Sequence, residues 1–531
     1  MCPSAAVSRK DGTLNTKAVL ADRLSEWATI AQRHGIRVPS FLSARIRSVF
    51  ARRLSVDTDL EDWTQPIVGE RGTASQHWMS DDPMEETFSS GVVTVDMAKV
   101  PSAEREQLRC VLVTGSLDVG GMEEVVAQLA RLLPEKGVAT AVLHALPDSY
   151  SGKASLGRLG LFLSQQHHVD VAALGRIEGE SWLRSQAPDV ISAHSAPSWV
   201  LKWARDHSIP YVENLHGMQS MYGIDWRSEM LRSRYLAGVV TVSDLVRRQY
   251  LDNNPEFPSS CCLTIPNGVD EARRRPGDRS RARMELGLTD EYLFICLARF
   301  SLQKNTYALV DAFYDVARAF PQAHLVIAGR PDEPLYLRHI RVLRDRLVLQ
   351  DRVHLRDHIS DPGKLLAAGD GFVLNSFFEG WSLASMEALY AGLPVVLSEV
   401  GGALDQVGGR RTPRGLVVNN PLGDPLQVGW ESMRAARFVK QINRQDLVAA
   451  MSVLVEERGH WARTRKELAA ESARRFGLDA TVRAHASALY RAARTGSISI
   501  SERPRHPAPS IGPNHDHKGQ RQSRSGGGYP L

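Results

Sequence analysis

The sequence predicts an α/β protein of two domains, each built around a mostly parallel sheet. The chain has 531 residues, more than the roughly 250 to 300 at which a single hydrophobic core stops growing. From residue 108 onward, short apolar strands alternate with amphipathic helices, which is the pattern of parallel α/β sheets. The alternation occurs as two separate series, so we expect two such domains.

Residues 1–106 precede the alternation and are predicted to form an accessory segment, partly helical and partly disordered. Within it, residues 41–54 form a basic amphipathic helix candidate that could lie on an anionic membrane. An apolar stripe of this kind more often packs against the protein body. Asp57 and Asp59 form an Asp-x-Asp sequence of a metal-binding type, but no βαβ frame surrounds it, so we expect no metal.

The remaining chain divides into four predicted parts. The first Rossmann-like domain covers residues 107–285 and the second covers 286–474, with an Arg-rich stretch at 271–283 near their boundary. A C-terminal helix is expected at 475–495 and a disordered tail at 496–531, which is poor in apolar residues. The strands expected in the two domains are 111–113, 141–143, 190–191 and 238–242, then 292–296, 325–327, 371–374 and 394–397.

Charge and cysteine content narrow the class of protein. The net charge of +5 comes from the C-terminal end, where seven Lys and Arg stand against two acidic residues from Arg491 onward. The body is close to neutral, and we therefore expect no nucleic-acid partner. Five cysteines, an odd and sparse set without metal-ligand spacing, favour a reducing compartment, and no apolar run is long enough for a spanning helix. The predicted location is cytoplasmic, with peripheral contact at the inner face of the membrane left open.

Ligands of doubly wound sheets bind at the carboxyl ends of the strands, where loops and helix N-termini offer amide groups to anions. The pair Gly120-Gly121 follows the first strand and would let backbone approach a ligand. Such a turn is structural more often than functional. Because it is not part of a Gly-x-Gly-x-x-Gly sequence, it gives no support to a nicotinamide or flavin cofactor.

The strongest local pattern follows the buried strand 371–374. Glu379 and Gly380 precede a predicted helix, and Glu387 lies within it about two turns further on. The helix N-terminus near Ser382 can present amides to a phosphate, while the carboxylates can accept hydrogen bonds from sugar and ribose hydroxyls.

A second pattern follows the strand 292–296. Arg299 and Lys304 are two cations five residues apart on one loop, a spacing that can clamp a diphosphate. Taken singly, each would more often be a solvated surface charge. Their chemistry would be to stabilise negative charge that develops on a leaving nucleotide diphosphate.

Taken together, these motifs make the chain from 108 to 492 resemble the family 4 (group 1) retaining glycosyltransferases of the GT-B fold. The resemblance rests on Glu379 and Glu387 at the family's spacing, on Arg299 with Lys304, on Gly120-Gly121, on Pro266-Asn267-Gly268-Val269-Asp270 and on Leu215-His216-Gly217. It implies two facing Rossmann-like domains with a cleft between them. Residues 475–490 resemble the family's last helix, which crosses back to the first domain.

The resemblance also implies roles for individual residues. Arg299 and Lys304 would hold the diphosphate, Glu379 the sugar hydroxyls, Glu387 the ribose, and His216 the sugar near its reacting carbon. The loop residues Gly380, Trp381, Ser382 and Leu383, together with Gly120-Gly121, would line the nucleotide-sugar site. Retention in this family is explained by front-face attack, in which a donor phosphate oxygen takes the acceptor's proton, so neither a metal nor another cofactor is expected.

Donor and acceptor stay open at this point. A UDP- or GDP-sugar is the expected donor, but Gly329-Arg330-Pro331 and Asp357 depart from the family pattern near the expected base pocket. The acceptor could be a glycan, a lipid-linked molecule or a small molecule. The competing interpretations are a catalytically silent GT-B protein that binds a nucleotide or a partner, and a GT-B sugar-nucleotide epimerase.

Overall fold

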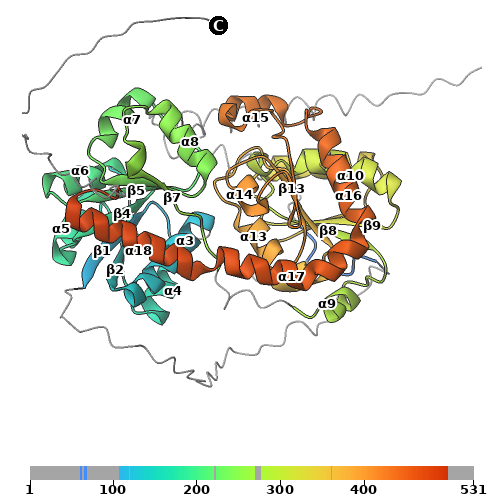
Figure 1. Ribbon diagram of the computed structural model, residues 1–531, viewed down its shortest axis with the longest axis horizontal. Helices are drawn as coiled ribbons and strands as arrows, with labels where there is room; N and C mark the ends of the chain where they lie inside the picture. The colour runs from blue at the N-terminus through green and yellow to red at the C-terminus, as the bar shows by residue number, and fades with distance from the viewer. Residues whose placement is uncertain are drawn as a thin grey trace, which may run out of the picture.

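The computed structural model describes residues 60–62, 65–68, 107–118, 120–219, 223–269, 277–359 and 362–499. In Figure 1 these residues form two lobes, each with a central sheet covered by helices. The basic segment 41–54, Asp57 with Asp59, and the tail from residue 500 lie outside the described residues.

The first lobe holds a seven-stranded parallel sheet with the order β3-β2-β1-β4-β5-β6-β7. This is the order of a doubly wound Rossmann sheet with one strand added. Its strands are β1 (Leu108–Thr114), β2 (Val138–Ala145), β3 (Asp170–Leu174), β4 (Val190–His194), β5 (Tyr211–Leu215), β6 (Gly238–Thr241) and β7 (Cys262–Thr264). Its helices are α3 (Gly121–Leu132), α4 (Gly157–Gln166), α5 (Arg176–Gln186), α6 (Ser198–Asp206), α7 (Trp226–Ser233) and α8 (Asp244–Asn253).

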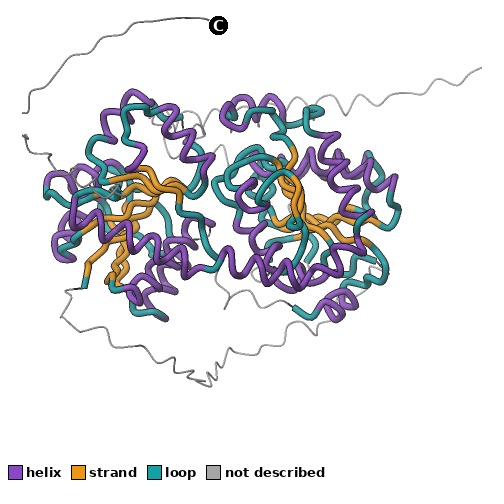
Figure 2. Tube along the Cα trace, viewed as in Figure 1, coloured by secondary structure: helices purple, strands orange, loops and turns teal. Residues whose placement is uncertain are grey.

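The second lobe repeats the plan with the order β10-β9-β8-β11-β12-β14-β13, in which only β13 runs antiparallel to its neighbour. Its strands are β8 (Tyr292–Leu297), β9 (Ala323–Ala328), β10 (Val353–Arg356), β11 (Gly371–Leu374), β12 (Val395–Ser398), β13 (Arg411–Thr412) and β14 (Gly415–Val418). Its helices are α9 (Arg279–Glu285), α10 (Thr306–Ala319), α11 (Pro334–Arg346), α12 (Gly363–Ala368), α13 (Leu383–Tyr390), α14 (Ala403–Val407), α15 (Trp430–Ala436), α16 (Arg444–Glu456) and α17 (Arg458–Phe476). Figure 2 shows in both lobes the strands surrounded by helices.

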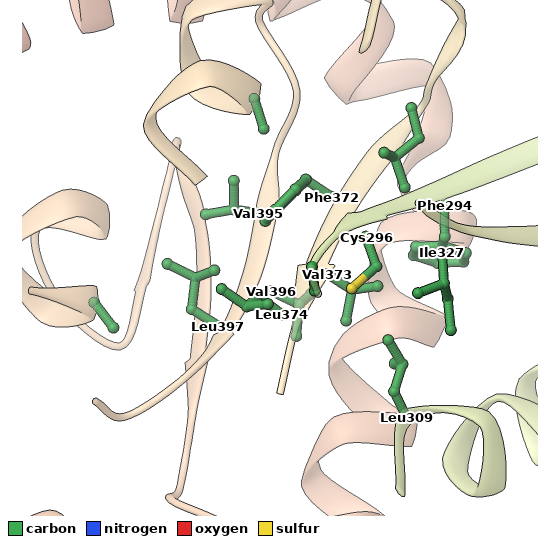
Figure 3. Close-up of a cluster of buried hydrophobic side chains, with 14 of the residues drawn as sticks. Phe294, Cys296, Leu309, Ile327, Phe372, Val373, Leu374, Val395, Val396 and Leu397 are labelled. Atoms are coloured by element: carbon green, nitrogen blue, oxygen red, sulfur yellow. The ribbon is translucent and has the colours of Figure 1, made fainter. Parts of the chain in front are cut away.

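The core of the second lobe explains why its strands were visible in the sequence. Strand β11 and its neighbours are buried on both faces, as parallel strands between two layers of helices must be. Phe294 and Cys296 of β8, Phe372 of β11 and Val395 of β12 have almost no exposed surface, and Figure 3 shows them packed together. Continuous apolar runs follow from this burial.

The two lobes are joined at Gly477, between α17 and α18 (Leu478–Thr495). Helix α17 packs on the second lobe, and α18 runs along the first (Figure 1). At the junction, the amide of Val269 donates to the carbonyl of Phe476 at 2.9 Å. A Cβ at Gly268 would lie 2.5 Å from the Cα of Leu478. The Pro-Asn-Gly-Val segment therefore needs glycine where the crossing helix begins.

Helix α9 belongs to the second lobe although it precedes the expected domain start at 286. Arg279 donates to a carboxylate oxygen of Asp370 at 2.6 Å, and Arg283 donates to the other at 3.1 Å. Ala282 lies in the same hydrophobic cluster as β8. Residue 286 thus lies inside the second lobe.

Part of the accessory segment also packs on the second lobe. Glu61 pairs with Arg356 in a parallel bridge beside β10, and the amide of Asp357 donates to the carbonyl of Glu61 at 3.0 Å. The Arg356 guanidinium is buried and donates to the carbonyl of Asp62 at 2.8 Å. Residues 60–62 therefore extend the edge of the second sheet.

The predicted start of the disordered tail at 496 is wrong for its first residues. Ile498 is fully buried, and its amide donates to the carbonyl of Ala237 at 2.9 Å. Its side chain fills the space that a Cβ of Gly238 would need. Ile498, together with the contact of Ser497 Oγ with Cys261 Sγ at 3.3 Å, therefore holds this part of the chain on the first lobe.

Candidate functional site

The motif residues lie where the strand order of each sheet reverses. In the first sheet the reversal is between β1 and β4. Gly120-Gly121 follows β1, and His194 is the last residue of β4. In the second sheet the reversal is between β8 and β11, which precede Arg299 and Glu379. Such reversals create the crevice in which doubly wound sheets bind ligands.

Lys304 and Glu379 form an ion pair at this point of the second sheet. Lys304 ends the short 3-10 helix Leu302–Lys304, and its Nζ lies 2.5 Å from Glu379 Oε1. The hydroxyl of Ser376 donates to the same oxygen at 2.7 Å. Both charged side chains are largely buried, with 16% and 9% of their surface exposed. The structure therefore brings together Lys304 and Glu379, which are separated in the sequence by α10, β9, α11, β10, α12 and β11.

Arg299 lies at the rim of the same site. Its side chain is 45% exposed and donates to Asp332 Oδ2 at 2.8 Å and to Gln303 Oε1 at 3.3 Å. Gln303 in turn donates to the carbonyl of Phe378 at 3.1 Å. The sequence interpretation missed both Asp332 and Gln303. Gln303 lies within the Arg299–Lys304 loop and connects it to the loop of Glu379. In the sequence, its position between the two cations was the feature that could have indicated this role.

The two lobes touch at Gly380. A Cβ at this position would lie 1.9 Å from the carbonyl oxygen of His216. On the other side of the contact, a Cβ at Gly121 would lie 3.6 Å from Leu383. The glycine expected to admit a phosphate thus admits the backbone of the first lobe, and the predicted loops of the two lobes face each other.

Helix α13 begins at Leu383 with Ser382 as its N-cap, whose hydroxyl accepts from the amide of Ser385 at 3.2 Å. Glu387 is half-buried in the second turn of this helix. Trp381 differs from its expected role in the binding surface. Its buried indole donates to the sulfur of Met386 and packs over Gly402, so the ring supports the loop from beneath.

His216 follows β5 and joins a buried polar group in the first lobe. Its Nε2 lies 2.7 Å from Nδ1 of His194, and the rings stack with centroids 5.0 Å apart. Burial and, as a smaller contribution, the nearby His485 of α18 together lower the pKa of His216 to about 3. Burial also places the pKa of His194 well below its usual value. Both rings are neutral at pH 7.

The buried His485 gives the fold a measurable pH dependence. Burial lowers its pKa from 6.5 to about 4, so the unfolded chain binds this proton first and stability falls as the pH drops from 6.5 toward 4. Between pH 8 and pH 5 we expect His485 to account for a loss of about 2 kcal/mol in the free energy of unfolding. Denaturant unfolding of wild type and His485→Leu at these two pH values measures the difference. Equal pH dependence in the two proteins would contradict it, and the exposed His460→Gln is the matched control.

Two family models match the chain in succession. The one described as Glycosyltransferase Family 4 matches residues 119–273, and the one described as Glycosyl transferases group 1 matches residues 278–425. Together they cover more than half of the chain, including Gly120-Gly121, His216, Arg299, Lys304, Glu379 and Glu387. The chain belongs to the family 4, group 1 glycosyltransferases.

Curated relatives match this chain in part. The Rhizobium meliloti lipopolysaccharide core biosynthesis mannosyltransferase LpsB is 31% identical over 29% of this chain and 47% of its own. A D-inositol 3-phosphate glycosyltransferase from Geodermatophilus obscurus is 26% identical over 54% of this chain and 72% of its own. The chain spans about half the length, or less, of several curated relatives, namely 47%, 34% and 47% of three of them.

Solved structures confirm the predicted fold class. The crystal structure of Anabaena Alr3699/HepE in complex with UDP and glucose has a TM-score of 0.58, with 19% sequence identity, over 72% of this chain and 99% of that one. At this identity the likeness shows the fold, which is the GT-B arrangement of two Rossmann-like domains. Within the described residues, no helix has the length and apolar character to cross a membrane.

Proposed function

We propose that this protein is a retaining glycosyltransferase that moves a sugar from a nucleotide-sugar donor to an acceptor. The observation that carries the proposal is the Lys304–Glu379 contact of 2.5 Å at the strand-order reversal of the second sheet. A cation for the diphosphate and a carboxylate for the sugar are then held side by side before the donor arrives. Such preorganised groups stabilise developing charge without reorganisation during the reaction.

The proposed division of roles follows the positions of the side chains. Lys304 and the exposed fork of Arg299 bind the diphosphate and stabilise it as it leaves. Glu379 accepts hydrogen bonds from sugar hydroxyls, and Glu387 on α13 accepts them from the ribose. His216 meets the sugar from the first lobe, across the contact at Gly380.

Transfer is proposed to need no metal and no further cofactor, because Lys304 and Arg299 supply the positive charge that the leaving diphosphate requires. The acceptor's proton would go to a donor phosphate oxygen by front-face attack, so the protein needs no separate base. We propose a cytoplasmic enzyme that can work at the inner face of a membrane.

The donor is proposed to be a UDP- or GDP-sugar. Support for UDP comes from Anabaena Alr3699/HepE, which shares the fold and is described with UDP and glucose. The acceptor is proposed to be a glycan, a lipid-linked molecule or a small molecule. The relatives' names span this range, from lipopolysaccharide core to D-inositol 3-phosphate.

A thermal-shift series with UDP, GDP and ADP, and with their sugar conjugates, tests the donor site. A ligand at about 100 times its dissociation constant stabilises the protein by roughly 2.7 kcal/mol. We expect a rise in Tm with one nucleotide, and its loss in Glu387→Ala. A series without any shift would favour a catalytically silent GT-B protein that binds a partner. Conversion of a nucleotide sugar to its epimer without transfer would favour the epimerase.

A further inference from the structure

A polar chain of four side chains runs through the first sheet to His216. Asn214 Nδ2 lies 3.0 Å from Ser192 Oγ, Ser192 Oγ lies 3.2 Å from His194 Nε2, and His194 Nδ1 lies 2.7 Å from His216 Nε2. The first three side chains are at most 3% exposed. Water is therefore excluded from them, and their hydrogen bonds have to be made with neighbouring protein groups.

Asn214 determines in which direction the hydrogen bonds of this row of side chains are donated. Its amide group also faces the carbonyl oxygen of Ala193 at 3.1 Å. A carbonyl oxygen only accepts, so the nitrogen of the Asn214 amide must point this way. The same nitrogen donates to Ser192 Oγ, which makes the serine oxygen an acceptor in this bond.

The serine hydrogen then has one destination. In the described part of the chain, Ser192 Oγ has only two partners, Asn214 and His194. Since Asn214 donates, the hydroxyl donates to His194 Nε2. A neutral imidazole with an accepting Nε2 carries its hydrogen on Nδ1, so His194 Nδ1 donates to His216 Nε2.

His216 is left with its hydrogen on Nδ1. The ring is partly exposed, and within the described residues that nitrogen has no hydrogen-bond partner. It is therefore a donor that a ligand oxygen can use. The opposite tautomer would present a lone pair there, which could only accept a hydrogen bond and could not donate one to a sugar or phosphate oxygen.

We propose that Ser192 and His194 are positioning residues that fix the tautomer of His216, so that its Nδ1–H donates to an oxygen of the donor sugar. This inference rests on the proposed function for the sugar contact, but the tautomer itself does not. Which nitrogen of a histidine bears the hydrogen is often set by the bond that the other nitrogen makes. Here that bond is supplied by a second histidine, oriented in turn by a serine.

The tautomer is measured directly by two-bond 1H–15N correlation spectra of the full chain labelled with ring-15N histidine. His216 is assigned by the signals that vanish in His216→Asn. We expect the wild type to carry the hydrogen on Nδ1. We expect Ser192→Ala, which leaves both imidazoles in place, to show a mixture of tautomers. A wild-type hydrogen on Nε2, or an Nδ1–H unchanged in Ser192→Ala and His194→Leu, would overturn the proposal.

Kinetics test the consequence for the reaction. His194→Leu removes the donor to His216, and kcat/KM for the nucleotide sugar should fall about tenfold, the worth of one hydrogen bond to the reacting sugar. His194→Asn can donate an amide hydrogen from the position of Nδ1 and should recover most of the loss. Unchanged kcat/KM in His194→Leu would overturn the role in the reaction. If the wild type transfers no sugar, the proposed function fails, while the spectra still decide the tautomer.

Discussion

Lys304→Ala is expected to lower kcat of sugar transfer by about 10² to 10³-fold, the usual effect of removing one preorganised group that stabilises developing charge. Lys304 Nζ lies 2.5 Å from Glu379, in a largely buried position where water replaces a lost charge poorly. Its removal therefore leaves the leaving diphosphate less stabilised and the Glu379 carboxylate without its cation.

The fold should survive this change, because Ser376 still donates to Glu379 at 2.7 Å. We expect the free energy of unfolding to drop by about 1 to 3 kcal/mol. Release of the nucleotide from a donor sugar gives kcat, and denaturant unfolding gives the stability. Lys440→Ala, at an exposed lysine of the same lobe, is the control and should keep wild-type activity. A folded and fully active Lys304→Ala protein would refute the role of Lys304 in binding the diphosphate.

The sequence predicted strands from short runs of apolar residues. Strand β11 and its neighbours in the second lobe show this, because burial on both faces leaves no polar position to interrupt the run. It did not predict β3, β7, β13 or β14, which are short or lie at or next to the edges of the sheets, and it did not predict β5 or β10. Both carry buried polar residues, Asn214 and Glu213 in β5 and Arg356 in β10, whose partners lie far away in the sequence.

The sequence predicted which residues of the candidate site lie in the loops and helix that follow the strand ends. Arg299, Lys304, Glu379 and Glu387 each follow a strand that meets the reversal of the sheet. Side-chain direction was not predictable, and Trp381 shows why. Its ring turns beneath the loop because Gly402 opens a space there, and that glycine lies on a different loop. His194 escaped notice for the same reason, since its partner His216 lies in the loop after another strand, β5.

Gly380→Ala is expected to reduce transfer by about 10²-fold or more while each lobe stays folded. The added Cβ would lie 1.9 Å from the His216 carbonyl oxygen, although Cβ contacts under 3.0 Å are essentially never found. The loops must then separate by roughly 1 Å, a displacement that costs about 10²-fold in rate when it misplaces reacting groups. Neither sheet contributes to the clash, so the two hydrophobic cores remain intact.

Substitutions at three glycines distinguish an effect on the contact between the lobes, which changes kcat, from an effect on the stability of one lobe, which changes Tm. Gly402→Ala places its Cβ 2.0 Å from the buried Trp381 ring in the same lobe, so its main effect should be a lower Tm. Gly459→Ala in α17 meets only an arginine side-chain nitrogen at 3.4 Å and should be neutral or slightly stabilising. Gly380→Ala should instead keep its Tm and its nucleotide affinity and lose kcat. Wild-type kcat in Gly380→Ala would show that the reaction does not use the close approach of His216 to the Glu379 loop.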